Sequence, residues 1–187
     1  MNSDLKNQSV IPDLSENISR IKKICSGTSD LLVNEVEISG IKTCLFCCEG
    51  MVSTATITEL VLHPLMNINL PYKSGEALLN HINGRMLLSI DRPVAYNYED
   101  FFRLLNSGFA LLAADGADYI LALGVQGYDK RGVDDPSGET NITGAHEGFV
   151  EVVRTNMSLI RRRLKSPTLV QKLFVKGTKT QTDMRIC

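Results

Sequence analysis

The chain has 187 residues, of which 43% are hydrophobic and 22% are charged. This composition excludes an intrinsically disordered chain, and the length suits one ordinary domain or two small ones. No apolar run approaches the length of a membrane-spanning helix, and the first residues lack the apolar core of a secretory signal. We therefore expect this chain alone to be soluble and not exported.

The charges are divided unevenly along the sequence. Residues 1–153 hold 11 basic and 20 acidic residues, whereas residues 154–187 hold 9 basic and 1 acidic, which gives net charges of −9 and +8. We expect the C-terminal segment to bind an acidic partner, either the acidic front of another copy or anionic lipid headgroups. Nucleic acid ranks last, because the chain shows no recognised nucleic-acid motif.

Hydrophobic spacing and breaker residues place the secondary structure in chain order. Helices are expected at residues 14–25, 53–62, 74–83 and 99–106, the second of them ended by Pro64. Strands are expected on both sides of Gly40, and at residues 109–114 and 119–125 around a hairpin turn. The last two strands are apolar throughout, so both faces of their sheet should be covered. The predicted fold class is α/β, a mixed β-sheet with helices packed on it.

Residues 144–165 are predicted to form one long helix. Its apolar stripe has the spacing of a helix that covers a core and comprises Phe149, Val153, Met157, Ile160 and Leu164. The polar side ends in three adjacent arginines, an order that suits the helix dipole. A solvated helix end explains such arginines in general. Three guanidinium groups nevertheless exceed what the dipole needs, and Asn156 at the border of the stripe needs a hydrogen-bond partner, so a docking surface is the alternative.

The same segment resembles a known family. The runs Glu-Gly-Phe-Val-Glu at 147–151, Arg-Thr-Asn at 154–156 and Leu-Ile-Arg-Arg-Arg-Leu at 159–164 resemble the signature of the N-terminal soluble domain of GerA-family spore germinant receptor A subunits, including the stage V sporulation protein AF-like paralogues. A looser resemblance runs through residues 38–65. One departure is Thr-Gly-Ala-His at 143–146, where the family usually has Arg-Gly-Pro-Arg, so an anion contact made there by relatives is not expected here.

The resemblance implies a non-enzymatic receptor domain without a cofactor. Its role would be receptor assembly and signal transmission, or gating of ion release, during bacterial spore germination. The implied partners are other A subunits in a homo-oligomeric ring, a transporter-like B subunit and a lipoprotein C subunit. The parent protein would lie in the inner spore membrane, with this domain on the cytosolic side and the membrane part missing from this fragment. The contacts between subunits or domains would be carried by Glu147, Arg154, Asn156, Arg161, Arg162 and Arg163.

A short internal repeat supports a second, truncated subdomain. Residues 32–43 recur at residues 169–180 with five identical positions, and Gly40 corresponds to Gly177. Both copies are predicted to be two strands joined at the glycine. The predicted organisation is an N-terminal helical segment at residues 1–30, a first α/β subdomain at 31–144, the basic linker helix at 145–168, and the first strands of a second subdomain at 169–187.

Other readings of the chemistry remain open. The arginines suit an anionic metabolite, so a small anionic ligand-binding sensor is the first alternative. A thiol-redox protein using Cys44 and Cys47 is the second, although strand alternation would send these two thiols to opposite faces. Residues 128–144 are predicted to be a mobile loop whose aspartates lack the spacing of a calcium loop. No nucleophile elbow or dinucleotide fingerprint occurs, so we do not expect an enzyme.

Overall fold

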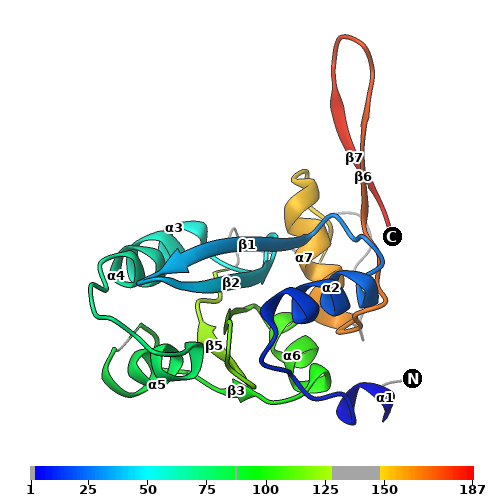
Figure 1. Ribbon diagram of the computed structural model, residues 1–187. Coiled ribbons are helices and arrows are strands. Elements are labelled where there is room, and N and C mark those ends of the chain that lie inside the picture. The colour runs from blue at the N-terminus through cyan, green and yellow to red at the C-terminus, as the bar shows by residue number, and fades with distance from the viewer. Residues whose placement is uncertain (1–2, 87, 128–147) are drawn as a thin grey trace.

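The structure is a computed structural model that describes residues 3–86, 88–127 and 148–187 (Figure 1). A five-stranded sheet with the strand order β1-β2-β4-β5-β3 forms its centre. The strands are β1 (Leu31–Ile38), β2 (Ile41–Cys48), β3 (Val94–Ala95), β4 (Phe109–Ala114) and β5 (Ile120–Gly124).

All four neighbouring pairs in this sheet are antiparallel, so the predicted mixed sheet is wrong. Tight turns join β1 to β2 and β4 to β5, and a hairpin can only be antiparallel. The segment between β2 and β4 is mostly helical, and after it the chain enters β4 antiparallel to β2. No two neighbouring strands of this sheet are therefore parallel. The α/β composition of the prediction is confirmed, because helices pack on this sheet.

Helices cover both faces of the sheet. One face carries α2 (Leu14–Ile24) and α6 (Tyr98–Leu105), and the short α1 (Ser3–Lys6) packs beside them. The other face carries α3 (Thr54–Ile57), the π-helical turn η1 (Thr58–Leu62), α4 (His63–Met66) and α5 (Gly75–Arg85). Neighbouring residues of β2 point to opposite faces of the sheet. The ring centroid of Phe46 lies 5.4 Å from that of Phe101 in α6, whereas Leu45 packs in the hydrophobic cluster on the other face. The prediction of a sheet covered on both faces is confirmed.

Local capping explains where the helices begin. The side chains of Asp13, Ser53, Ser74 and Asn97 each accept a hydrogen bond from the backbone N–H three residues later. The prediction that Pro64 ends the second helix is wrong, since the helical path continues to Met66. The wider turn η1 lies just before the proline, and Pro64 occupies the first turn of α4, where its missing N–H is tolerated.

The C-terminal part consists of α7 (Val153–Arg163) and a two-stranded sheet of β6 (Lys172–Lys176) and β7 (Thr182–Ile186). Figure 1 shows this ribbon projecting from the body of the molecule. The predicted hairpins of the internal repeat are confirmed, and both glycines have the positive φ that their turns require: 81° at Gly40 and 90° at Gly177.

The predicted long helix is wrong in its N-terminal part, because residues 148–152 are not helical. The Asn156 side chain accepts a hydrogen bond from Val150 N at 2.7 Å and donates one to Val150 O at 2.6 Å. These bonds hold Val150 outside the helix, and the valines at 150, 152 and 153 weaken helix propensity there. The predicted loop at 128–144 lies outside the described residues, as does Glu147.

Candidate functional site

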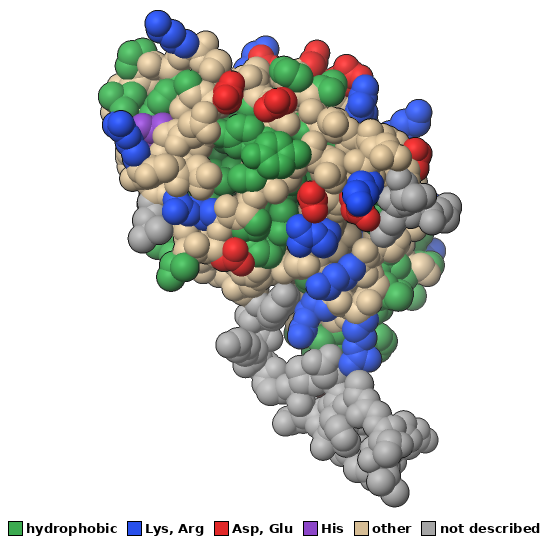
Figure 2. Space-filling model, turned by 90° about the horizontal axis from the view of Figure 1, so that it is seen from below, with side chains coloured by type: hydrophobic (Ala, Val, Ile, Leu, Met, Phe, Trp, Pro, Cys, Tyr) green, Lys and Arg blue, Asp and Glu red, His purple; other side chains and the backbone are tan. Residues whose placement is uncertain are grey.

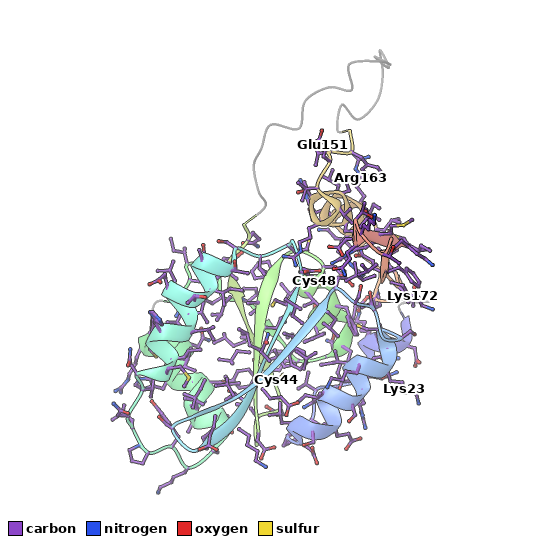
Figure 3. The ribbon with its side chains drawn as sticks, turned by 90° about the horizontal axis from the view of Figure 1, so that it is seen from above. Lys23, Cys44, Cys48, Glu151, Arg163 and Lys172 are labelled. Carbon is purple, nitrogen blue, oxygen red and sulfur yellow. The ribbon has the colours of Figure 1, made fainter. Side chains whose placement is uncertain are left out.

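The most highly organised polar site lies where the C-terminal segment meets the sheet. It combines the turn before β1, the end of β2, helix α7 and the base of the β6–β7 ribbon. Figure 3 shows Cys48, at the end of β2, on the same side of the molecule as Arg163 of α7 and Lys172 of β6. We call this site the junction and define it by Asp30, Glu49, Arg154, Arg161, Gln171 and Arg185.

A buried ion pair forms the centre of the junction. Arg161 Nε donates to Asp30 Oδ2 at 2.9 Å, and Arg161 Nη2 donates to Oδ1 at 2.9 Å and to Oδ2 at 2.7 Å. The two side chains are only 4% and 2% exposed. The same guanidinium group donates to the carbonyls of Ser166 at 3.0 Å and Leu169 at 2.9 Å. One arginine therefore fixes α7, the segment that follows it and the start of β1 to one another.

A second acidic residue bridges two arginines from different elements. Glu49 Oε1 lies 3.1 Å from Arg154 Nη2 of α7, and Glu49 Oε2 accepts a hydrogen bond from Arg185 Nη2 of β7. The exposed fraction is 18% for Glu49 and 5% for Arg185, whereas Arg154 is 71% exposed. The pair with Arg185 is thus shielded from solvent and the pair with Arg154 is largely screened.

Backbone contacts at Gln171 complete the junction. Ser29 donates through both its backbone N and its Oγ to Gln171 O, each at 2.8 Å, and Gln171 N donates to Thr28 Oγ1 at 2.9 Å. Gln171 is fully buried, and within the described residues neither the nitrogen nor the oxygen of its side-chain amide has a hydrogen-bond partner. The ribbon therefore begins at a point that is tied to the sheet by hydrogen bonds as well as ion pairs.

The structure separates the residues predicted to form one docking surface. Arg161 is buried in the chain's own ion pair, and Asn156 holds the backbone of Val150. Arg154 and Arg163 are exposed, and Arg162 is half-buried. Glu147 lies outside the described residues.

The predicted apolar stripe of this helix is wrong at its two ends. Phe149 is 71% exposed and Leu164 is 56% exposed, while Met157 and Leu159 are buried. The face that α7 buries is rotated from the predicted one because it also accommodates Arg161.

Sequence reasoning missed the acidic half of the junction. Asp30 and Arg161 are separated by 131 positions, and Glu49 and Arg185 by 136. No local motif marks either pair. The only signal was the excess of acidic residues before residue 154 and of basic residues after it, which predicts attraction but not which residues meet.

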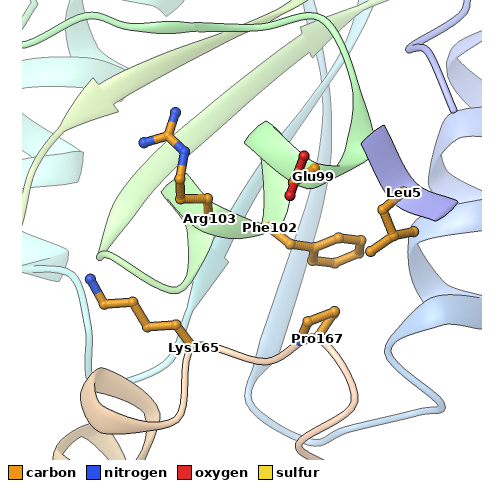
Figure 4. A pocket seen from close by; sticks show the side chains of 6 residues that line it. All are labelled: Leu5, Glu99, Phe102, Arg103, Lys165 and Pro167. Carbon is orange, nitrogen blue, oxygen red and sulfur yellow. The ribbon is translucent and has the colours of Figure 1, made fainter. Parts of the chain in front are cut away.

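The grooves of the described surface do not form a preorganised anion site. The groove at the junction is lined by Arg154 and Arg185, but Glu49 already pairs with both guanidinium groups. A separate cleft, shown in Figure 4, is lined by the apolar side chains of Leu5, Phe102 and Pro167 and by the charged side chains of Glu99, Arg103 and Lys165. Arg103 pairs with Asp100 at 3.1 Å and Lys165 Nζ donates to Ser107 Oγ at 3.1 Å, so both cations already have partners.

On the face that carries α5, β3 and α6, Figure 2 shows an apolar area with charged side chains around it.

The cysteines of the predicted thiol alternative are buried on opposite faces. Cys44 belongs to the cluster under α2 and α6, and Cys47 to the cluster under α3, α4 and α5. Burial raises the pKa of the Cys44 thiol to about 12 and that of the Cys47 thiol to about 11. Two protonated, separated thiols do not suit disulfide exchange, which needs an accessible thiolate.

Within the described residues, no helix combines the length and the apolar character needed to cross a membrane.

The fold and the junction together define an α/β domain whose C-terminal ribbon is tied to its sheet by ion pairs. The chain belongs to the GerA family, since residues 19–187 match the family model described as Bacillus/Clostridium GerA spore germination protein. The family membership predicted from residues 147–164 is thus confirmed.

Three relatives and one solved structure illustrate the match. Spore germination protein KA of Bacillus subtilis (strain 168) is 29% identical over 185 residues, covering 95% of this chain and 33% of that protein. Spore germination protein B1 of the same organism is 28% identical over 176 residues (93% and 36%), and its stage V sporulation protein AF is 29% identical over 166 residues (88% and 33%). This chain spans about a third of the length of these curated relatives.

The fold is shared with the N-terminal domain of the A subunit of the Bacillus megaterium spore germinant receptor GerK3. The TM-score is 0.73 at 24% sequence identity, and the match covers 95% of this chain and 65% of that chain.

Proposed function

We propose that this chain is part of the N-terminal domain of a spore germinant receptor A subunit. Its role is non-enzymatic: it assembles the receptor and transmits the signal that starts ion release during germination. The match to the GerA family over residues 19–187 and the fold shared with the GerK3 A subunit domain support this proposal.

The observation that carries the signalling role is the junction. Asp30 directly precedes β1 and Glu49 directly follows β2, whereas Arg154 and Arg161 belong to α7 and Arg185 to the ribbon. A displacement of the ribbon relative to the sheet must break or rearrange the Glu49–Arg185 pair. The junction is therefore suited to couple the position of the sheet to whatever follows the ribbon in the receptor.

We further propose that the ribbon opens a second subdomain. The divisions at residues 1–30, 31–144, 145–168 and 169–187 keep their predicted bounds in this proposal. Support comes from the repeat that relates β6–β7 to β1–β2, and from apolar side chains of the ribbon that remain exposed: Leu173, Phe174, Val175, Met184 and Ile186. Side chains of this kind are normally covered in a complete domain.

In the assembled receptor, we propose contacts with other A subunits in a ring, with a transporter-like B subunit and with a lipoprotein C subunit. The parent protein would lie in the inner spore membrane, with this domain on the cytosolic side. The proposed contact residues are Glu147, Arg154, Asn156, Arg162 and Arg163; Arg161 contributes by holding α7 in place.

Spore germination with variants of the parent receptor tests the signalling role. Glu49→Gln and Arg185→Gln should each slow the germinant-triggered fall in optical density of a spore suspension, because each removes the same pair. The double variant should be no slower than the single ones, since residues that act as a pair are not additive. Glu59→Gln, an exposed acidic residue outside the junction, is the control. Normal germination by both single variants, at normal receptor levels on immunoblots, would refute the proposal.

A further inference from the structure

Two open strand edges of this chain carry opposite charges. β1 is an edge strand of the five-stranded sheet, and within the described residues no backbone hydrogen bond joins its outer side to another segment. In the part of the chain that the structure describes, β6 is paired only with β7, so it too has one open side. We propose that β1 of one copy pairs with β6 of a second copy and thereby extends the sheet across the contact. This inference deepens the assembly role proposed above and rests on it.

Apart from the charged Glu35 and Glu37, the edge of β1 lacks the features that usually protect an edge strand. Such strands are commonly short, interrupted by a bulge, or supplied with lysine or proline. β1 has 8 residues, contains neither lysine nor proline, and pairs with β2 in unbroken register from Leu31 to Ile38. In Figure 3, β1 crosses the molecule without a helix in front of it. Its outward N–H and C=O groups are therefore available to an extended segment of another molecule.

Charge identifies the segment that fits. Glu35 and Glu37 of β1 are exposed and, two positions apart, lie on the same face of the strand. Lys172 and Lys176 of β6 are also exposed and share one face. In the described part of the chain, none of these four side chains has an ion-pair partner. Opposite charges across paired strands are stabilising, whereas β1 paired with a second β1 would place acidic residues against acidic residues.

The apolar residues of the two strands also match. On β6, Leu173 and Val175 lie on the face opposite the lysines and are 45% and 56% exposed. On β1, Leu32 and Val36 lie on the face opposite the glutamates, and Leu32 is 37% exposed. Pairing that places lysines beside glutamates therefore places aliphatic side chains beside aliphatic side chains.

The internal repeat explains why β6 keeps an open side. The shift of 137 positions places β6 on β1 and β7 on β2, with Lys172 in the position of Glu35. β2 is an inner strand that pairs with β4, so further strands of a second sheet would add to β7. The proposed contact with β6 is compatible with a completed second subdomain. Because β1 and β6 are different surfaces, the contact is head-to-tail and generates a ring or a filament.

Sedimentation velocity on the 187-residue chain tests the pairing, in reducing buffer so that Cys187 cannot form an intermolecular disulfide. The wild-type chain should self-associate with rising concentration, and less so at higher salt. The variants E35K/E37K and K172E/K176E should each raise the dissociation constant about tenfold, because each places like charges at both edges. An equimolar mixture of the two variants should associate again, since each open edge then meets one of opposite charge. Glu59→Lys, an exposed residue away from both edges, should change nothing.

Three results would overturn the pairing: a monomeric wild-type chain at every concentration, unchanged association of the two variants, or a mixture that stays monomeric. If E35K/E37K melts at a different temperature from the wild-type chain, the milder E35Q/E37Q variant replaces it. E35Q/E37Q should also associate more weakly than the wild-type chain. Hydrogen exchange of the β1 amides provides a second readout and should slow in the mixture relative to either variant alone. The spore assay of the junction variants is independent of these measurements. A monomeric chain with the expected germination defects would refute the edge pairing alone.

Discussion

Replacing Arg161 with methionine should destabilise the domain severely. The guanidinium group is 4% exposed and makes three hydrogen bonds to Asp30 and one each to the carbonyls of Ser166 and Leu169. Methionine fills a similar volume but leaves the Asp30 carboxylate buried without its cation. Breaking a buried ion pair from one side costs about 3–5 kcal/mol, a large part of the stability of a typical domain.

Urea denaturation followed by circular dichroism measures this loss as a lower unfolding midpoint. Arg163→Met is the matched control on the same helix, and its exposed position predicts a change within about 0.5 kcal/mol. Adding Asp30→Asn to Arg161→Met removes the uncompensated charge, so the double variant should be more stable than Arg161→Met alone. A loss below about 1 kcal/mol for Arg161→Met, or a double variant less stable than the single one, would refute the argument that a buried pair holds the junction.

Four further outcomes are expected. Gly75→Ala should lower the unfolding free energy by about 1–3 kcal/mol, because the added Cβ would lie 2.2 Å from the carbonyl oxygen of Asp115. Gly84→Ala in the same helix meets nothing within 4 Å and should instead raise it by about 0.5–1 kcal/mol; equal effects of the two variants in urea titrations would contradict this reading. In the folded chain at neutral pH, a thiol reagent such as Ellman's reagent should titrate Cys187 alone, since the other four cysteines are buried; prompt reaction of a second thiol would count against it. Stability should fall as the pH rises above 9, because burial raises the pKa of Cys44 from 9.0 to about 12 and the folded chain therefore holds this proton more tightly than the unfolded chain; a urea midpoint that stays constant between pH 9 and 11 would contradict the sign.

Local features of the sequence predicted most of the secondary structure. Helical spacing and breaker residues located α2, α5 and α6. The unbroken apolar runs of β4 and β5 correctly indicated a sheet covered on both faces. These features depend on residues that are close in sequence, so the local spacing of hydrophobic residues predicts them directly.

Features that depend on distant partners were not predictable in this way. The prediction of a mixed sheet was wrong, because nothing in the apolar sequences of β2 and β4 indicates whether the two strands pair parallel or antiparallel. The helix at residues 144–165 was expected to be long because its spacing is helical throughout, yet a side chain six positions away fixes Val150 outside it. The acidic partners in the junction were missed for the same reason, since tertiary contact alone brings Asp30 to Arg161.

Two groups of basic residues in the C-terminal segment differ in their partners. Arg154, Arg161 and Arg185 lie near the base of the ribbon and meet acidic residues of the same chain. Lys172 and Lys176 lie on β6, the strand with the open side, and have no acidic partner in the described part of the chain. The first group orders the ribbon against the sheet, which reduces the conformational entropy that association must overcome. The second group, presented on a ribbon already held in place, is then free to select an acidic edge such as that of β1 on another copy.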